Sequence, residues 1–345
     1  MRSIEIWGIY PPPIGGVTIH LKRLFHSLEN KTNVYFVDFG ETGKKYPSKH
    51  IRHAGPYITE VLRLLFGKKK TIHLHSFSIL LAVCFILFGW RHRYGVTIHN
   101  QRAIRITSGI QIRIYTMFLR SCNFIIMNDA NYANKFSDFF SVSKDKITIL
   151  PAFITPLESE KKGLPNEILQ FRNSHQFLLS GNAFKLNKEN GVDVYGLDMM
   201  IELISNLRNQ GIDAGLLFCL PVIGDECYYN ALQDRIRDNG LEEHIFFVQN
   251  NVDNAFEYWA IADLFLRPTL TDMEGISVKE ALCVGTNVVA SDVCIRPKEC
   301  YVFKNRDFDD FYNVVHNFYN RKLYHKKMEF TSVDTPTELL KIYHI

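Results

Sequence analysis

The stretch RPTLTDMEGISVKEALCVGTNVVAS, residues 267–291, decides the fold. It places three carboxylates, Asp272, Glu274 and Glu280, around one glycine. The apolar runs DLFLRPT and NVVAS at its two ends are typical of buried strands, and the spacing of SVKEALCV predicts a helix that ends before Gly285. A strand, a loop, a helix and a second strand form one unit of a parallel α/β sheet. Such sheets bind ligands beyond the carboxyl ends of their strands, which is where the three acids fall.

The helix start has two interpretations. Ser277 and Glu280 stand three positions apart, which is the spacing of a capping box. Capping accounts for Glu280 but leaves Asp272 and Glu274 without a role. A helix start at a ligand site offers amides to a phosphate, and a neighbouring acid can accept hydrogen bonds from ribose hydroxyls. The sequence leaves both the cap and the nucleotide site open.

Short strand-like runs alternate with amphipathic helical patterns along the chain, which predicts parallel βα units. In the first half six runs predict one doubly wound sheet: IEIWGIY, NVYFVDF, TIHLH, YGVTIH, NFIIMND and KITILPAF. A polar segment with two prolines at 155–168 predicts a linker. A second series of strands follows: HQFLLSGN, AGLLFCLPV, HIFFVQN, DLFLRPT and NVVAS. We therefore expect one domain at 1–155 and another at 170–322.

Composition agrees with this division, because 345 residues that are 46% hydrophobic and 22% charged can build about two domains. The seven cysteines are scattered and form no C-x-x-C pair, which argues against a disulfide framework or a zinc site and favours a reducing cytoplasm.

MRSIEIWGIY lacks an apolar segment followed by a cleavage site, so we expect no secretory signal. The fourteen-residue apolar run at 77–90 is shorter than the roughly 20 residues that span a bilayer, and predicts a buried or membrane-facing helix.

Charge is divided unevenly between the two halves. Residues 1–150 hold 21 Lys and Arg against 8 Asp and Glu, whereas residues 151–345 hold 19 against 28. The basic half suits phosphates or an anionic membrane surface, and the plain alternative is a solvated charged face without a partner. Its basic residues interleave with apolar ones, as on an interfacial helix: GKKK at 67–70, RHR at 91–93, and Arg102, Arg105, Arg113 and Arg120. No RNA-binding motif is present, so we expect no nucleic-acid partner.

The run from Asp272 to Glu280 resembles the paired-acid motif of glycosyltransferase family 4, in which two carboxylates lie eight positions apart around a glycine-containing turn. TDMEGISVKEAL, with GTNVVASD and Arg296-Pro297 after it, resembles a bacterial surface-polysaccharide branch in which aspartate replaces the first glutamate. The resemblance implies an α/β GT-B fold, two Rossmann-like doubly wound parallel-sheet domains facing across a cleft. It also implies that the second domain holds a nucleotide sugar and that a C-terminal segment, 323–345, packs back on the first domain.

Within the motif, the resemblance assigns Glu280 to the ribose and Asp272 to hydroxyls of the donor sugar, with a catalytic role for Asp272. Further donor contacts are expected from the loop and the helix start, at Glu274 and the amides of Gly275, Ile276 and Ser277. Because these acids have a binding role, they are not interpreted as the acid and base of a hydrolase.

Two features of the first half also resemble the family. Gly15 and Gly16 precede a predicted helix, and the family has a similar glycine pair near the diphosphate and acceptor. Glycines there let the backbone approach a ligand closely, although an ordinary tight turn would use them too. His99 ends the strand YGVTIHN, where the family places a histidine near the transferred sugar, and the alternative is a buried core histidine. His73 and His75 alternate to one face of a strand, but no third ligand has a recognisable spacing, so we interpret them as structural and expect no metal.

The second domain begins with FLLSGNAFKLNKENGVDVYGLD, which resembles the family's diphosphate-binding turn with two departures. Asn182 stands where arginine is usual, and Tyr195 stands where lysine is usual. Lys185 or Lys188 could supply the missing positive charge. We favour Lys185 as a catalytic and donor-binding residue, and we expect Asn182 to contact the donor.

The resulting hypothesis is a retaining glycosyltransferase that moves a sugar from a nucleotide sugar, first of all a UDP-sugar, to a lipid-linked or saccharide acceptor. The pathway implied is bacterial capsule, O-antigen or exopolysaccharide assembly, on the cytoplasmic face of the inner membrane and without a metal or other cofactor. Cations and oriented amides would stabilise the departing diphosphate, and positioning of the acceptor would do much of the rest. Two alternatives stay open: a nucleotide-sugar epimerase of GT-B fold and a catalytically inactive GT-B binding partner.

Overall fold

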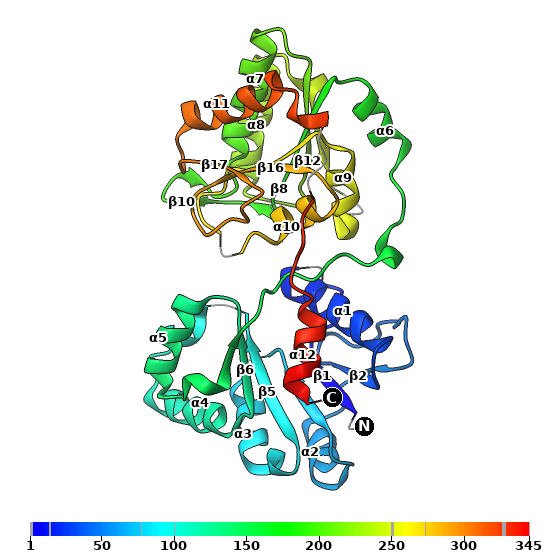
Figure 1. Cartoon of the computed structure of the whole chain (residues 1–345), viewed down its shortest axis with the longest axis vertical. Coiled ribbons are helices and arrows are strands. Elements are labelled where there is room, and N and C mark those ends of the chain that lie inside the picture. Colours follow the sequence, from blue (N-terminus) through cyan, green and yellow to red (C-terminus); the bar gives the residue numbers. More distant parts are fainter. Residues whose placement is uncertain are drawn as a thin grey trace. The chain divides into compact units, whose positions relative to one another are not determined.

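The computed structural model describes residues 3–13, 15–76, 78–99, 101–249, 252–272, 274–325 and 329–344. The chain divides into two compact units (Figure 1). The first unit comprises residues 1–154 and 333–345, and the second comprises residues 155–332. Each unit is built on its own parallel sheet.

The first unit has a seven-stranded sheet of order β3-β2-β1-β4-β5-β6-β7. Its strands are β1 (Ile4–Gly8), β2 (Val34–Asp38), β3 (Ile51–His53), β4 (Thr71–Leu74), β5 (Arg93–Ile98), β6 (Phe124–Met127) and β7 (Ile147–Ile149). Its helices are α1 (Gly16–Glu29), α2 (Tyr57–Phe66), α3 (Ile79–Phe88), α4 (Gly109–Ser121), α5 (Ala130–Phe140) and α12 (Thr335–Tyr343). The prediction of six strands missed β3, because its three residues hold one buried apolar side chain and show no period.

The second unit has a six-stranded sheet of order β14-β12-β8-β15-β16-β17. Its strands are β8 (Phe177–Asn182), β12 (Ala214–Cys219), β14 (Ile245–Val248), β15 (Leu264–Arg267), β16 (Asn287–Ser291) and β17 (Tyr301–Phe303). Its helices are α6 (Asn166–Asn173), α7 (Leu197–Asn209), α8 (Glu226–Asp238), α9 (Phe256–Ile261), α10 (Ile276–Cys283) and α11 (Phe308–Asn320). Two small two-stranded sheets join β9 (Lys185–Leu186) to β13 (Val222–Gly224) and β10 (Lys188–Glu189) to β11 (Val192–Asp193).

Short 3₁₀ helices lie in the connections, at Gly89–Arg91, Gln101–Arg105, Lys144–Lys146, Glu158–Glu160, Glu242–His244, Val252–Asn254 and Leu323–His325. The acidic run RDFDD at 306–310 leads into α11, where Asp307 caps the helix by accepting from the amide of Asp310 and Asp309 and Asp310 lie in the first turn, at the positive end of the helix dipole.

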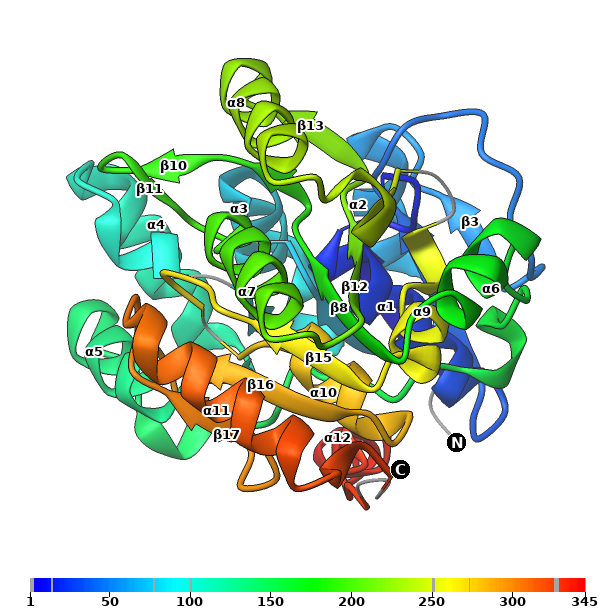
Figure 2. The ribbon, with the colours of Figure 1, turned by 90° about the horizontal axis from the view of Figure 1, so that it is seen from above.

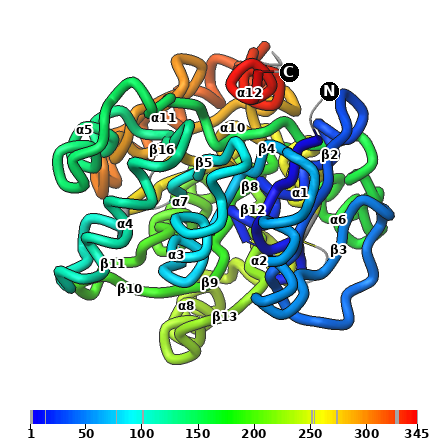
Figure 3. Tube along the Cα trace, turned by 90° about the horizontal axis from the view of Figure 1, so that it is seen from below, coloured from blue at the N-terminus to red at the C-terminus, as the bar shows by residue number. Residues whose placement is uncertain are grey.

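Both sheets are covered on two faces, because alternate side chains of a strand point to opposite sides. Phe177 and Leu179 of β8 pack with α7 and α11 in one core cluster, whereas Leu178 packs with α9 and α10 in another. Figure 2 shows α7 and α11 on one side of this sheet. In the first unit, α1 and α12 cover one face. The helices α2, α3 and α4 lie side by side over the other (Figure 3).

The C-terminal helix returns to the first unit. Tyr343 of α12 is buried, and its hydroxyl lies 2.6 Å from His73 Nδ1 on β4. The return begins at residue 333, not at 323 as expected, because Leu323 and Tyr324 pack against the core of the second unit. Residues 326–328 of the expected segment lie outside the described part of the chain.

The apolar run at 77–90 forms the ten-residue helix α3, and Phe77 lies outside the described residues. Within the described ranges, no helix has both the length and the apolar character needed to cross a bilayer. Three side chains of α3, those of Leu81, Ala82 and Phe85, are buried in the core of the first unit.

Strand order fixes where each unit can bind a ligand. In the first sheet the order reverses between β1 and β4, and in the second between β8 and β15. Parallel α/β sheets bind ligands at such switch points, beyond the carboxyl ends of the strands. The predicted site residues are therefore to be compared with two places. These are the residues after β1 and β4 in the first sheet and the residues after β8 and β15 in the second.

Candidate functional site

Asp272 lies in the loop between β15 and α10, between two arginines. Its Oδ2 accepts from Arg267 Nε at 3.2 Å and from Arg296 Nη1 at 2.9 Å. The side chains of Asp272 and Arg296 are 10% and 2% exposed. Burial by itself would raise the pKa of Asp272, but the two guanidinium groups outweigh it and hold this pKa below its usual value. The carboxylate is therefore ionised, and it fixes two cations at the end of the sheet.

Arg267 reaches from β15 to β8 across the switch point. Its Nη1 donates to Asn182 Oδ1 at 3.1 Å, and its guanidinium carbon lies 5.5 Å from the centre of the Tyr195 ring. Asn182 and Tyr195 are the two positions where the sequence departs from the family's arginine and lysine. One arginine from the neighbouring strand thus brings positive charge to both positions.

Gly275 turns the chain into α10. It is the N-cap residue, with φ 64° and ψ 59° in the left-handed region. A Cβ at this position would lie 2.6 Å from Arg296 Nη1 and 3.3 Å from Asp272 Oδ2. Glycine is required here both for the backbone conformation and for the close approach of the arginine–aspartate cluster.

The position of Gly275 corrects the capping-box interpretation. The helix begins at Ile276, so Ser277 is its second residue and not its N-cap. A capping box needs the serine outside the first helical turn, with non-helical dihedral angles. The Ser277–Glu280 pair is therefore not a cap. Glu280 stands partly buried within α10, and Glu274 forms a short ion pair with Lys279 of the same helix.

The two candidate lysines lie after β8 in different surroundings. Lys185 is exposed on β9, three residues after Asn182. Lys188 lies with its Nζ 3.9 Å from the centre of the Tyr228 ring. In the part of the chain that the structure describes, no hydrogen bond or ion pair joins Lys185 to the Asp272 cluster.

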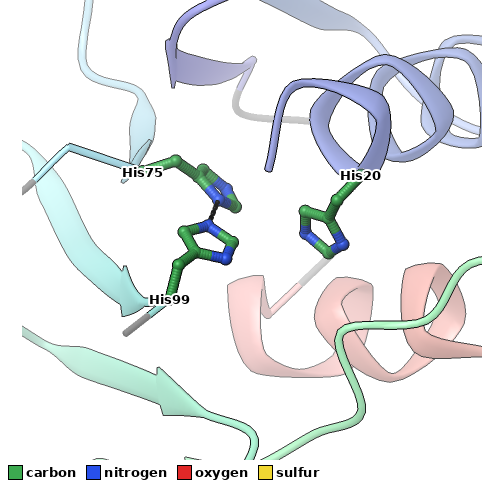
Figure 4. Close-up of side chains that lie close together, drawn as sticks. All are labelled: His20, His75 and His99. Atoms are coloured by element: carbon green, nitrogen blue, oxygen red, sulfur yellow. Dashed lines mark hydrogen bonds between the residues drawn. The ribbon is translucent and has the colours of Figure 1, made fainter. Parts of the chain in front are cut away.

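At the switch point of the first sheet, α1 and the ends of β4 and β5 bring three histidines together (Figure 4). His99 follows β5, and its Nε2 lies 2.9 Å from His75 Nδ1. His20 of α1 is 5.3 Å from His99 between ring centres, and its Nδ1 lies 2.6 Å from the carbonyl oxygen of Ala152. His20 has no local signal in the sequence as a partner of these histidines, because it lies fifty-five positions before His75. His73 is a core residue. Its two ring nitrogens form hydrogen bonds with the hydroxyls of Tyr343 and Thr97.

The glycine pair also lies near this switch point. Gly15 is extended, with φ −170°, and caps α1 through its amide, which donates to Thr18 Oγ1 at 2.9 Å. Gly16 is the first residue of α1. A Cβ at Gly15 would meet nothing nearer than Thr18 Oγ1 at 4.0 Å, so the fold itself does not demand a glycine there.

Known proteins with a similar sequence or structure show which fold carries this geometry. Residues 176–306, which run from the start of β8 to beyond β17, match the family described as glycosyl transferases group 1. The structure of Anabaena Alr3699/HepE in complex with UDP superposes with a TM-score of 0.70 at 14% identity, over 94% of this chain and 91% of that one. The chain has the GT-B fold. The GT-B glycosyltransferase from Rickettsia africae ESF-5 is also similar, with a TM-score of 0.69 at 12% identity, over 99% of this chain and 98% of that one.

A third similar structure is the catalytic domain of starch synthase IV from Arabidopsis thaliana bound to ADP and acarbose. It has a TM-score of 0.67 at 14% identity, over 100% of this chain and 99% of that one. No curated protein matches the chain. The comparisons support a glycosyltransferase, the enzyme class that the sequence predicted. The matched segment contains β8, β15 and α10, the elements that carry the arginine–aspartate cluster of this GT-B chain.

Replacing Gly275 with alanine is expected to destabilise the second unit of the GT-B fold by about 2 to 3 kcal/mol, since a left-handed φ alone costs about 1 to 2 kcal/mol and the Cβ also displaces Arg296. Gly191→Ala is the matched control, because Gly191 has φ 81° with no atom within 4 Å of a Cβ. Urea unfolding of both variants measures the difference. Equal destabilisation of the two would show that contact with the cluster adds nothing to backbone strain.

Proposed function

We propose that the chain transfers a sugar, with retention of configuration, from a nucleotide-sugar donor that binds at the carboxyl end of the second sheet. The observation that carries this proposal is the buried cluster of Asp272, Arg267 and Arg296 at the β8–β15 switch point, directly before α10. A diphosphate carries charge that guanidinium groups recognise well. UDP-sugars are the first donors to test, because similar structures were solved with UDP and with UDP-glucose.

In the proposed reaction, Arg267 and the first amides of α10 stabilise the negative charge that grows on the departing diphosphate. Lys185, exposed on β9, contributes further positive charge near Asn182. Asp272 holds the two arginines through Oδ2 and binds a hydroxyl of the donor sugar. Its depressed pKa makes it a poor general base, so the leaving phosphate takes the proton of the acceptor.

The remaining donor contacts follow the predicted roles. Glu280 binds the ribose hydroxyls, and Glu274 lines the loop with the amides of Gly275, Ile276 and Ser277. In the first unit, His99 lies near the transferred sugar, and the backbone at Gly15 and Gly16 approaches the diphosphate or acceptor. A ligand close to the backbone at Gly15 would explain why this position is a glycine, although the fold leaves room for a side chain there.

Nucleotide binding tests the donor site. Calorimetry against UDP, GDP, ADP, dTDP and CMP is expected to show saturable binding of one nucleotide, weakened at least about tenfold in Glu280→Ala because a lost charged hydrogen bond is worth about 1.5 to 3 kcal/mol. Glu202→Ala, on α7 of the same unit, is the control for loss of a surface carboxylate. Unchanged affinity in Glu280→Ala would remove Glu280 from the site, and no binding by any nucleotide would contradict the proposal.

The acceptor is proposed to be lipid-linked and reached at an anionic membrane surface, in bacterial surface-polysaccharide assembly. Four side chains on α2, α4 and the turn after α3 are strongly exposed: Ile58 at 66%, Phe66 at 79%, Trp90 at 73% and Ile110 at 73%. Helix α3 packs against both α2 and α4, and α2 also packs against the 3₁₀ turn that carries Trp90, so these side chains lie on neighbouring elements, whose exposed side is the proposed surface. Exposed basic residues accompany them, at Lys68, Lys69, Arg105, Arg113 and Arg120.

Not all of the basic residues singled out in the sequence belong to this surface. Lys70 is buried in an ion pair with Glu5, and Arg93 donates to the carbonyl oxygen of Ile342 on α12. Their charges stabilise the first unit and cannot contact lipid. Basic side chains beside exposed aromatic and aliphatic ones suit an anionic interface better than neutral lipid.

Vesicle sedimentation tests this surface. The chain is expected to bind vesicles with anionic headgroups more strongly than neutral ones, and Phe66→Ser with Trp90→Ser is expected to reduce that binding by at least about tenfold, from the loss of two large apolar side chains. Ile295→Ser is the matched control, because Ile295 is 92% exposed and lies in the second unit. Equal loss in the control and the double variant, or no binding by the wild type, would contradict the membrane proposal.

The two alternatives predict different products. An epimerase would change the nucleotide sugar without an acceptor, and an inactive partner would bind the donor without turnover. An inactive partner would be expected to lack the arginine and lysine of the diphosphate-binding turn, and this chain has Asn182 and Tyr195 at those positions. Arg267, in contact with Asn182 and Tyr195, supplies positive charge at that place and favours the active transferase.

A further inference from the structure

The three histidines at the switch point of the first sheet form a cluster within the first unit, and the proposed function uses only His99 of the three. His20 comes from α1, His75 follows β4 and His99 follows β5. One ring nitrogen of each lies within 4.8 Å of the corresponding nitrogen of the other two. Figure 4 shows the three rings converging from separate elements, with the His75–His99 pair facing His20. We propose that His20, His75 and His99 bind one transition-metal ion of the zinc class.

The spacing of the donor atoms fits one ion. Two imidazole nitrogens bound to the same tetrahedral zinc, each at about 2.0 to 2.1 Å, lie about 3.4 Å apart. His75 Nδ1 and His99 Nε2 are 2.9 Å apart, which is close to that value. The ring nitrogens all lie within 4.8 Å of one another, so a shift of one ring by about 1.5 Å or less brings them to that spacing.

The chemistry of the donor set selects the ion. Three neutral imidazoles without a carboxylate suit zinc, cobalt, nickel or copper, whereas magnesium and calcium require oxygen ligands.

Two features of the surroundings support a ligand role. His20 Nδ1 donates to the carbonyl oxygen of Ala152 at 2.6 Å, which fixes the tautomer that carries its lone pair on Nε2. Metal-ligating histidines commonly have such a carbonyl partner on the other ring nitrogen. His75 Nδ1 and His99 Nε2 face each other at hydrogen-bond distance, so one ion between these two nitrogens would replace the hydrogen bond that joins them.

A small cavity borders the cluster and leaves room for a further ligand. His20, His99 and Thr97 line it together with Asn128, and Leu339 of α12 lines it as well. Three protein ligands with an open fourth position are typical of zinc sites that keep water or exchange a ligand. An ion could therefore enter beside His20 and His99 and complete its coordination with water.

One consequence rests on the proposed function. A metal that binds His99 would withdraw this side chain from the transferred sugar, so Zn²⁺ is expected to lower the rate of sugar transfer. Metal binding can be measured without donor or acceptor. Failure of the metal site and failure of the proposed function are therefore distinguishable.

Titration of the full-length chain, free of any histidine tag, with Co²⁺ followed by Zn²⁺ tests the site. We expect visible absorption of tetrahedral Co²⁺ that saturates at one equivalent and disappears when Zn²⁺ is added. His20→Gln and His99→Gln are each expected to weaken this binding at least about tenfold, since loss of even an indirect partner of a metal ligand costs that much. His99 is only partly buried, so His99→Gln remains informative if a variant at the buried His75 does not fold.

His244→Gln is the matched control, because His175, Asp213 and His244 form the other grouping of metal-ligating side chains among the described residues. It is expected to leave the Co²⁺ spectrum and affinity unchanged. The proposal is overturned if the wild type shows no saturable tetrahedral spectrum. It is equally overturned if His20→Gln and His99→Gln bind Co²⁺ as the wild type does, which would place the ion at other side chains such as the exposed Cys227.

Discussion

Asp272→Asn is expected to lower the free energy of unfolding by about 3 to 5 kcal/mol, the cost of removing one partner from a buried ion pair. Arg296 is 2% exposed and Arg267 is 12% exposed, so neither guanidinium can recover full hydration when the carboxylate is gone. Urea unfolding at pH 7 measures the change. Glu280→Gln is the control, because it removes an equal charge from the same motif.

The pH dependence of stability provides a second measure of the same pair. The pKa of Asp272 is lower in the folded chain than in the unfolded chain, where it is about 3.9. Its contribution is therefore complete above the unfolded value and is lost as the pH falls through the folded one. Below about pH 4 the difference in stability between the wild type and Asp272→Asn should begin to shrink, and it should vanish only below the folded pKa. A constant difference between them from pH 7 to pH 3 would contradict the ion-pair explanation.

Arg267→Ala is expected to lower kcat/KM for sugar transfer by about 100-fold or more, the usual effect of removing one group that stabilises a developing negative charge. Arg267 contacts Asn182 and Tyr195, so no other residue need supply charge at that end of β8. Arg267→Lys should retain part of the activity, because lysine keeps the charge but not the planar pair of donors. Steady-state kinetics with the donor identified by calorimetry measures both variants.

The matched control for Arg267 lies at the other end of the same strand. Arg172 pairs with Asp263, directly before β15, at the amino end of the sheet. Arg172→Ala should change stability but not kcat/KM. Lys185→Ala separates the two candidate cations. A large loss in Lys185→Ala with near-normal activity in Arg267→Ala would return the phosphate role to the lysine that the sequence favoured.

Much of the fold could be predicted because buried parallel strands are continuous apolar runs. All residues of β4, β6 and β12 are buried, and these strands appear directly in the sequence. Strands of two or three residues, such as β3, β9 and β17, have too few side chains to show a period. They were missed for that reason.

The acidic motif could be predicted because its residues are close together in the chain. The backbone conformation of this motif could not be predicted. The Ser277–Glu280 spacing left a cap open, whereas Gly275 in a left-handed conformation starts the helix two residues earlier than that cap would allow. Backbone dihedral angles at a turn depend on what the turn packs against. Here Arg296 and Asp272 occupy the space where a side chain of residue 275 would lie.

The sequence by itself determined the α/β class, the succession of two sheets and the acidic loop after β15, since each rests on apolar periodicity or on neighbouring residues. Only the tertiary structure decided which distant residues complete the sites. Arg267 meets Asn182 because β15 lies beside β8 in the sheet, and His20 meets His75 and His99 because α1 packs on β1, the strand next to β4. Sheet order is set by the packing of the whole unit, so no local pattern in the chain records these contacts.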